Sequence, residues 1–167
     1  DGAPPYEMAG RGEERVPLID FQNLDGWVVE CWEAEGRLYG SREQVLYHRP
    51  RSAKLVYKGS GPRSALLIRP EEPIPIPEPW DCVNFWNYGN AWCWVQESQP
   101  WLNVSIVVRD AAGRVYDLPM GVIDYEYWHL THARFNAPAD KVKRPMEFVG
   151  IRLTNAGGAR ERKIYLG

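Results

Sequence analysis

The sequence has few cysteines, and their spacing does not suit a metal site. Among its 167 residues only Cys31, Cys82 and Cys93 are cysteine. An odd count without a CxxC pair argues against a structural zinc site and against a complete disulfide framework. One disulfide with a free thiol, or three buried thiols, are the alternatives. The second is favoured, because an unpaired cysteine usually packs as a small apolar residue.

An excess of one charge and long apolar runs are also missing. The chain has 20 Lys and Arg against 22 Asp and Glu, a formal net charge of −2. Proteins that bind nucleic acid usually show a basic patch, so this balance predicts no nucleic-acid partner. Apolar runs reach only a few residues, whereas a helix that spans a bilayer needs about 20. The sequence therefore predicts no membrane partner.

Recognisable catalytic and metal-binding motifs are lacking as well. There is no GxSxG, no HExxH and no Gly-rich phosphate loop. A glycosidase needs two carboxylates about 5–10 Å apart across a cleft, and Asp124 with Glu126 suits a hydrated surface equally well. His129 and His132 lie three residues apart, which on a strand puts them on opposite faces. We expect no catalytic residue, no metal ligand and no cofactor.

The sequence also shows no sustained helical periodicity, and it consists instead of short β-like runs. Residues 1–15 are polar and rich in Gly and Pro, which indicates a flexible arm or linker. Residues 16–167 read as one domain of short strands separated by turn signals, which predicts an all-β antiparallel sandwich of the jelly-roll kind. The expected strands are 27–32, 37–39, 44–48, 53–57, 65–69, 82–88, 92–95, 102–109, 115–117, 127–135, 147–154 and 163–166.

Side-chain alternation assigns the faces of several expected strands. In 102–109, Leu102, Val104, Ile106 and Val108 share one face. In 147–154, strict alternation puts Phe148 with Gly150, Arg152 and Thr154, opposite Ile151 and Leu153. Proline recurs at positions 73, 75, 77 and 79. Proline cannot donate to a sheet ladder, so this run is expected at an edge or in an extended crossover.

Aromatic residues are what the sequence has in excess. Five of its eight tryptophans lie between positions 80 and 101, in the segment WDCVNFWNYGNAWCWVQESQPW. Such a cluster builds either a thick core or a platform for flat, partly apolar ligands. A sugar ring is a ligand of that kind, because its C–H face stacks on aromatic rings and its hydroxyls bond to amides. The asparagine and glutamine side chains beside these rings supply such amides, so the cluster favours a platform for carbohydrate over a core.

The expected strand faces suggest where a sugar would bind. On the strand 82–88, Asn84, Trp86 and Tyr88 share a face, and a hairpin turn at 89–90 would return 92–95 beside it. On 127–135, Trp128 and Leu130 are read as core, which leaves His129 to face solvent or ligand. The predicted ligand-binding residues are Asn84, Trp86, Tyr88, Asn90, Trp92, Trp94, Gln96, Arg109 and His129.

The order of several motifs resembles one family. The chain reads LIDFQNLDGW, KLVYKG, NFWNYGN, SIVVRDAAGRVYDLPMG, VIDYEYWHLTHARF, FVGIRLTN and KIYLG. This succession, which covers roughly residues 18–167, is similar to the galactose-binding-domain-like jelly rolls. Those domains serve as non-catalytic carbohydrate-binding modules of secreted polysaccharide-degrading enzymes. The resemblance implies a polysaccharide or oligosaccharide partner, a tethered catalytic domain and a secreted or cell-surface location.

The chain departs from this family at the positions that hold calcium. Many of these modules bind a structural calcium through an early acid and a final Asp, whereas this chain has Gln22 early and Gly167 last. Asp20 and Asp25 remain as oxygen ligands, without a recognisable loop spacing. Three other functions stay open. They are a structural accessory sandwich without ligand, a small jelly-roll glycoside hydrolase or lyase, and a protein-binding adhesion module.

Overall fold

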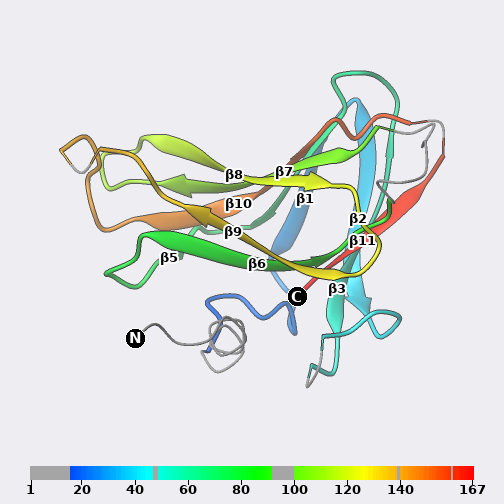
Figure 1. Ribbon diagram of the computed structural model, residues 1–167, viewed down its shortest axis with the longest axis horizontal. Helices are drawn as coiled ribbons and strands as arrows, with labels where there is room; N and C mark the ends of the chain where they lie inside the picture. Colours follow the sequence, from blue (N-terminus) through cyan, green and yellow to red (C-terminus); the bar gives the residue numbers. More distant parts are fainter. Residues whose placement is uncertain (1–15, 47–48, 92–99, 139, 159) are drawn as a thin grey trace, which may run out of the picture.

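Two antiparallel sheets face each other in the computed structural model, which describes residues 16–46, 49–91, 100–138, 140–158 and 160–167 (Figure 1). One sheet, called sheet A, has the strand order β1-β4-β10-β7-β8, with β5 beside β10. The other, sheet B, has the order β2-β3-β11-β6-β9. The described residues contain no helix, and hence none that could cross a membrane. The predicted all-β sandwich is confirmed.

The strands of the two sheets have the following bounds. Sheet A consists of β1 (Trp27–Trp32), β4 (Ala65–Pro70), β10 (Glu147–Thr154), β7 (Leu102–Arg109), β8 (Val115–Ile123) and β5 (Ile74–Pro75). Sheet B consists of β2 (Ala34–Ser41), β3 (Ser52–Gly59), β11 (Arg162–Leu166), β6 (Cys82–Tyr88) and β9 (Trp128–Arg134). The proline run holds only the two-residue β5, in keeping with its expected edge role. Two expected strands are too short: 37–39 corresponds to the eight residues of β2, and 115–117 corresponds to the nine residues of β8. Residues 44–46, expected to begin a strand, form none.

The core lies between the sheets and follows the predicted alternation of β7. Leu102, Val104, Ile106 and Val108 are all buried there. In β10 the alternation is broken by a register shift between Phe148 and Gly150. This bulge places Phe148 in the core together with Ile151, so the prediction for Phe148 was wrong. A Cβ on Gly150 would approach the Ile68 carbonyl oxygen to 2.7 Å, which explains the glycine at the bulge.

The two sheets are joined at one end by a sharp corner between β1 and β2. Glu33, the single residue between these strands, has a φ of 45°. Its carbonyl oxygen accepts hydrogen bonds from Ser60 and Ser64, and its carboxylate pairs with Arg63 at 2.6 Å. These contacts hold a backbone conformation that non-glycine residues rarely adopt. Cys31, next to this corner, is exposed, contrary to the expectation of three buried thiols, because it lies near the end of the edge strand β1.

Candidate functional site

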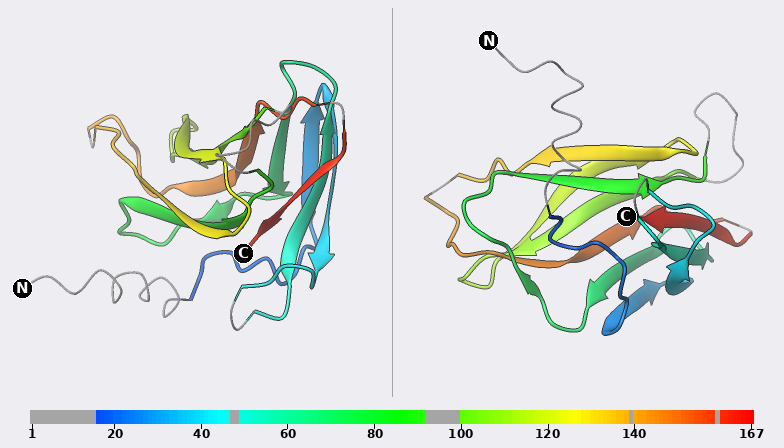
Figure 2. Two further views of the ribbon diagram at one scale, coloured as in Figure 1. Left: turned by 45° about the vertical axis from the view of Figure 1, so that its right-hand side comes forward. Right: turned by 90° about the horizontal axis from the view of Figure 1, so that it is seen from below.

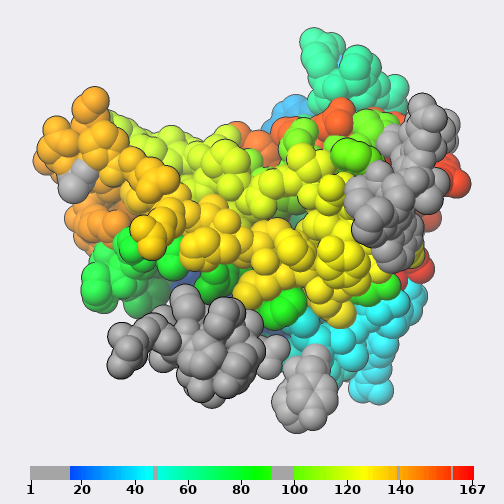
Figure 3. Space-filling view, in the orientation of Figure 1, coloured from blue at the N-terminus to red at the C-terminus, as the bar shows by residue number. Residues whose placement is uncertain are grey.

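The outer face of sheet B carries the aromatic residues that the sequence singled out. β6 and β9 pair along their whole lengths, so that directly opposed residues share a face. The outer pairs are Asn84 with His132, Trp86 with Leu130, and Tyr88 with Trp128. Phe85 and Asn87, between them, are buried. We call the six outer residues Asn84, Trp86, Tyr88, Trp128, Leu130 and His132 the β6–β9 strip; β9 crosses the centre of the face in Figure 3.

The rings of the strip are half-buried, and two of them, Tyr88 and Trp128, pack against each other. Tyr88 packs edge-on against Trp128 and against Tyr165 of β11, with a centroid distance of 5.8 Å in each case. Trp86, Trp128 and Leu130 are neither fully buried nor fully exposed. Rings fixed in this way lose little conformational entropy when a ligand stacks on them. The strip therefore has the preorganised apolar surface that a sugar face requires.

Polar groups lie at the open end of the strip. His132 Nδ1 and Asn84 Oδ1 are 2.6 Å apart, and both residues are exposed. An amide oxygen only accepts hydrogen bonds, so Nδ1 is the donor in this contact. In the neutral imidazole Nε2 is then an acceptor, while the Asn84 amide nitrogen is a donor. The pair presents one donor and one acceptor beside Trp86, which is what reading a sugar hydroxyl needs.

A charged network lies beside the strip, across the neighbouring strands β11 and β3. Glu43 accepts hydrogen bonds from Lys54 at 2.6 Å, from Lys163 at 3.3 Å and from the Tyr165 hydroxyl at 2.5 Å. These hydrogen bonds lower the pKa of Glu43 from 4.5 to about 2. The bond from Lys54 has the largest effect, followed by those from Tyr165 and Lys163. Glu43 is thus ionised at neutral pH and cannot act there as a general acid.

The other predicted ligand-binding residues lie elsewhere. Arg109 belongs to sheet A and pairs with Glu147 at 2.8 Å, while Asn90 donates to the buried Tyr57 hydroxyl at 2.9 Å. His129 packs against Tyr125 with tilted rings and a centroid distance of 4.8 Å, on the face of β9 opposite to the strip. The structure brings none of these three together with Asn84, Trp86 and Tyr88. Trp92, Trp94, Gln96 and the expected hairpin strand 92–95 lie outside the described residues.

The predicted faces of β9 were wrong. Trp128 and Leu130 were expected in the core, but the register puts them outside, beside Tyr88 and Trp86. The inner positions hold His129, Thr131 and Ala133. Thr131 donates to the Phe85 carbonyl oxygen at 2.9 Å, which satisfies its buried hydroxyl. The more polar side chains of β9 thus face inward and the more apolar ones outward, the opposite of what hydrophobic alternation predicted.

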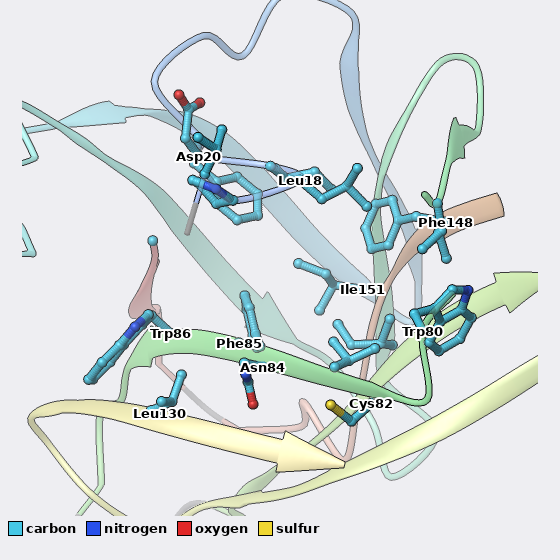
Figure 4. Close-up of a pocket in the computed structure, with 18 of the residues that line it drawn as sticks. Leu18, Asp20, Trp80, Cys82, Asn84, Phe85, Trp86, Leu130, Phe148 and Ile151 are labelled. Atoms are coloured by element: carbon cyan, nitrogen blue, oxygen red, sulfur yellow. The ribbon is translucent and has the colours of Figure 1, made fainter. Parts of the chain in front are cut away.

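An apolar cavity of about 690 Å³ opens beside β6 (Figure 4). Asn84 and Phe85 leave the strand in opposite directions, and Phe85 points toward Ile151 across the cavity. Residues 16–21 form another wall, and Trp86, Leu46 and Gly167 also line the cavity. The segment that begins at residue 16 also passes close to the C-terminus in both views of Figure 2. No sequence pattern predicted this cavity, because its walls come from segments far apart in the chain.

The described residues contain no group of three or more His, Cys, Asp and Glu that could hold a metal ion. The two early acids that were weighed as calcium ligands lie in local turns. Asp20 Oδ1 accepts a hydrogen bond from the Gln22 backbone, and the Asp25 backbone donates to Asn23 Oδ1. These contacts are typical of Asx turns. That the chain holds no cofactor stays a prediction, and a structural calcium stays the alternative that the resemblance implies.

Comparison with known proteins supports the fold and leaves the family open. No family model and no curated protein matches the chain. A solved carbohydrate-binding module, from a study of promiscuous specificity in the β-sandwich superfamily, has a TM-score of 0.63 and 14% identity over 86% of this chain. The enzymatically active domain of tailspike protein 4 from bacteriophage CBA120 has a TM-score of 0.54 and 14% identity over 87% of this chain. The chain spans 56% and 19% of their lengths.

Proposed function

We propose that this protein binds a polysaccharide or oligosaccharide on the β6–β9 strip and does not itself catalyse a reaction. The observation that carries the proposal is the cross-strand ladder, which puts Trp86 next to the Asn84–His132 pair on one outer face. Stacking on rings of this kind contributes about 1 kcal/mol each, so affinities from micromolar to millimolar are expected. The carbohydrate-binding module with a similar fold adds support.

The absence of catalysis in this proposal rests on the carboxyl groups. A glycosidase needs a carboxylic acid with a raised pKa to protonate the leaving group. Where a carboxyl pKa is clearly displaced among the described residues, at Glu43 and Asp110, it is lowered. Burial raises the pKa of Asp110, but backbone hydrogen bonds from Arg114, Lys143 and Ala112 outweigh it. The tailspike domain keeps a hydrolase or lyase as the second candidate.

A ligand-free structural role fits the tryptophans less well. That role predicts that every ring is buried in the core or at an interdomain contact. Trp32 is 49% exposed and Trp101 is 36% exposed, and Trp86 and Trp128 are half-buried on an outer face. A tethered catalytic domain and a secreted or cell-surface location are proposed on the family resemblance. The galactose-binding-domain-like subtype of the sandwich is proposed on the same resemblance.

The test is calorimetric titration with a panel of soluble polysaccharides, with and without calcium. We expect one glycan to bind saturably, and Trp86→Ala to weaken its binding about tenfold, which corresponds to about 1.4 kcal/mol. Trp32→Ala is the matched control, because it removes an exposed indole from sheet A. The proposal fails if no glycan binds, or if Trp32→Ala weakens binding as much as Trp86→Ala does.

A further inference from the structure

The outer faces of the two sheets differ in charge, although the chain as a whole has a net charge of only −2. Because side chains alternate along a strand, the registers assign each charged strand residue to the inner or the outer face. The outer positions of sheet A hold three acids and three bases, which pair as Glu30 with Arg69, Glu147 with Arg109 and Asp117 with Arg152. Those of sheet B hold one acid, Glu35, and five bases, Arg37, Lys54, Lys58, Arg134 and Lys163. Sheet B therefore has the more basic outer face.

Four of these five bases have an acidic partner. Lys54 and Lys163 pair with Glu43, Arg37 pairs with Glu161, and Lys58 lies directly opposite Glu35. Arg134 is the exception, since its guanidinium forms no ion pair within the described residues. Asp81 precedes β6 and lies opposite Phe135, so alternation directs its carboxylate away from the face that carries Arg134. Arg134 thus keeps its charge available to a ligand.

Arg134 continues the β6–β9 strip by one step. It lies on β9 two residues after His132 and directly opposite Cys82, and it is exposed. Two residues of a strand span about 7 Å, so Arg134 lies about 7 Å along the strand from the Asn84–His132 pair and about 13 Å from the level of Trp86. A single sugar ring does not cover the longer distance. A ligand that contacts both Trp86 and Arg134 therefore has more than one sugar unit.

The chemistry of Arg134 suits an anionic group better than a hydroxyl. A guanidinium presents a planar fork of N–H donors that matches two oxygens of a carboxylate or a sulfate, and hydrogen bonds between charged groups are stronger than neutral ones. The paired bases of this face would have to give up a carboxylate to bind such a group, whereas Arg134 gives up only water. Of the outward bases, Arg134 therefore gains most from an anionic ligand.

We propose that the polysaccharide bound on the β6–β9 strip is acidic, an inference that rests on the proposed function. One sugar unit stacks on Trp86, and another unit of the same chain presents a carboxylate or a sulfate to Arg134. The Asn84–His132 pair lies between the two and bonds to hydroxyls. In this arrangement the rings supply the stacking contact, while Arg134 determines that a charged polymer is preferred over a neutral one.

The test compares acidic polysaccharides with neutral forms of the same polymers, by calorimetry on the full chain. Polygalacturonate and alginate are titrated beside their carboxyl-reduced forms, and dextran sulfate beside dextran. We expect one acidic polymer to bind at least about tenfold more tightly than its neutral form, and salt to reduce that advantage. The pair that shows it distinguishes a carboxylate from a sulfate. The inference is overturned if no acidic polymer binds better than its neutral form. The proposed function fails as well only if the neutral glycans of the wider panel are not bound either.

Two variants of the protein test the residue itself. Arg134→Gln removes the charge beside the strip. Arg37→Gln is the matched control, because it removes a charge from the same outer face whose side chain is 73% exposed and paired with Glu161. We expect Arg134→Gln to weaken binding of the acidic polymer about tenfold and Arg37→Gln less than about twofold, with the fold of both checked by circular dichroism. Equal losses would contradict the proposal, because only the overall charge would then matter. So would equally tight binding of single-stranded polyadenylate, which would indicate a site for phosphate backbones.

Discussion

At the scale of single residues, the core contains a buried polar pair, Asn87 and Tyr125, whose hydrogen-bonding groups need partners. Asn87 is fully buried on β6, and its Oδ1 accepts a hydrogen bond from the Tyr125 hydroxyl. Burial, more than any other cause, raises the pKa of Tyr125 to about 12, so the phenol stays protonated and donates throughout the neutral range. The Asn87 amide nitrogen has no partner among the described residues. The pair therefore depends on a single bond.

Removing that bond is expected to destabilise the fold. Tyr125→Phe leaves the Asn87 oxygen buried without a donor, which costs about 1–3 kcal/mol. Urea denaturation followed by circular dichroism measures the change in the free energy of unfolding. Tyr39→Phe is the control, because Tyr39 is 43% exposed and Lys54, the side chain beside its hydroxyl, keeps its ion pair with Glu43; we expect a change within about 0.5 kcal/mol there. Equal effects of the two substitutions would show that the buried pair contributes nothing specific.

The Glu43 network predicts how stability depends on pH. Because the folded protein lowers the pKa of Glu43 from 4.5 to about 2, its stabilising contribution is complete above pH 4.5 and is lost as the pH falls toward 2. Glu43→Gln cannot titrate. Its melting temperature should therefore fall less steeply than that of the wild type between about pH 5 and pH 2. Calorimetric scans at several pH values compare the two slopes, and parallel curves would refute the assignment.

At the scale of elements, strand positions were easier to predict than strand faces. β6 and β7 begin and end where their alternation and turn signals indicated. β9 and Phe148 show why faces were harder. On β9 an inward Thr131 is satisfied by a backbone oxygen, and on β10 a bulge shifts the register by one residue. Both depend on contacts with another strand, which a single sequence does not contain.

The turn after β6 depends on a close approach of two backbones. The Ala91 amide donates to the Tyr125 carbonyl oxygen at 3.1 Å, and a Cβ on Gly89 would overlap that same oxygen. We expect Gly89→Ala to destabilise the protein by about 1–3 kcal/mol through overpacking. Gly40→Ala is the matched control, because the nearest atom to its Cβ would be Arg51 Cδ at 3.8 Å. Thermal unfolding of both variants decides the point, and a Gly89→Ala protein as stable as Gly40→Ala would contradict it.

At the scale of the whole molecule, the sandwich separates residues that the sequence grouped by chemistry alone. Arg109 was predicted to bind the ligand together with Trp86, yet it lies on sheet A while Trp86 lies on sheet B. Trp128, Leu130 and His132 join the strip because β9 pairs with β6 although the paired residues lie 40 to 48 positions apart in the chain. The spacing of aromatics thus predicted one strand of the candidate site, and only the sheet order supplied its partner strand.

The measurement that tests the central claim most directly is nuclear magnetic resonance of the tryptophan indole N–H groups during titration with the glycan that binds best. The chain has eight tryptophans, which give eight signals, each assignable by single substitution. The proposed function predicts that the signals of Trp86 and Trp128 shift saturably, while those of Trp27, Trp32 and Trp80 stay in place. Shifts that leave both Trp86 and Trp128 unmoved would contradict carbohydrate binding on the β6–β9 strip.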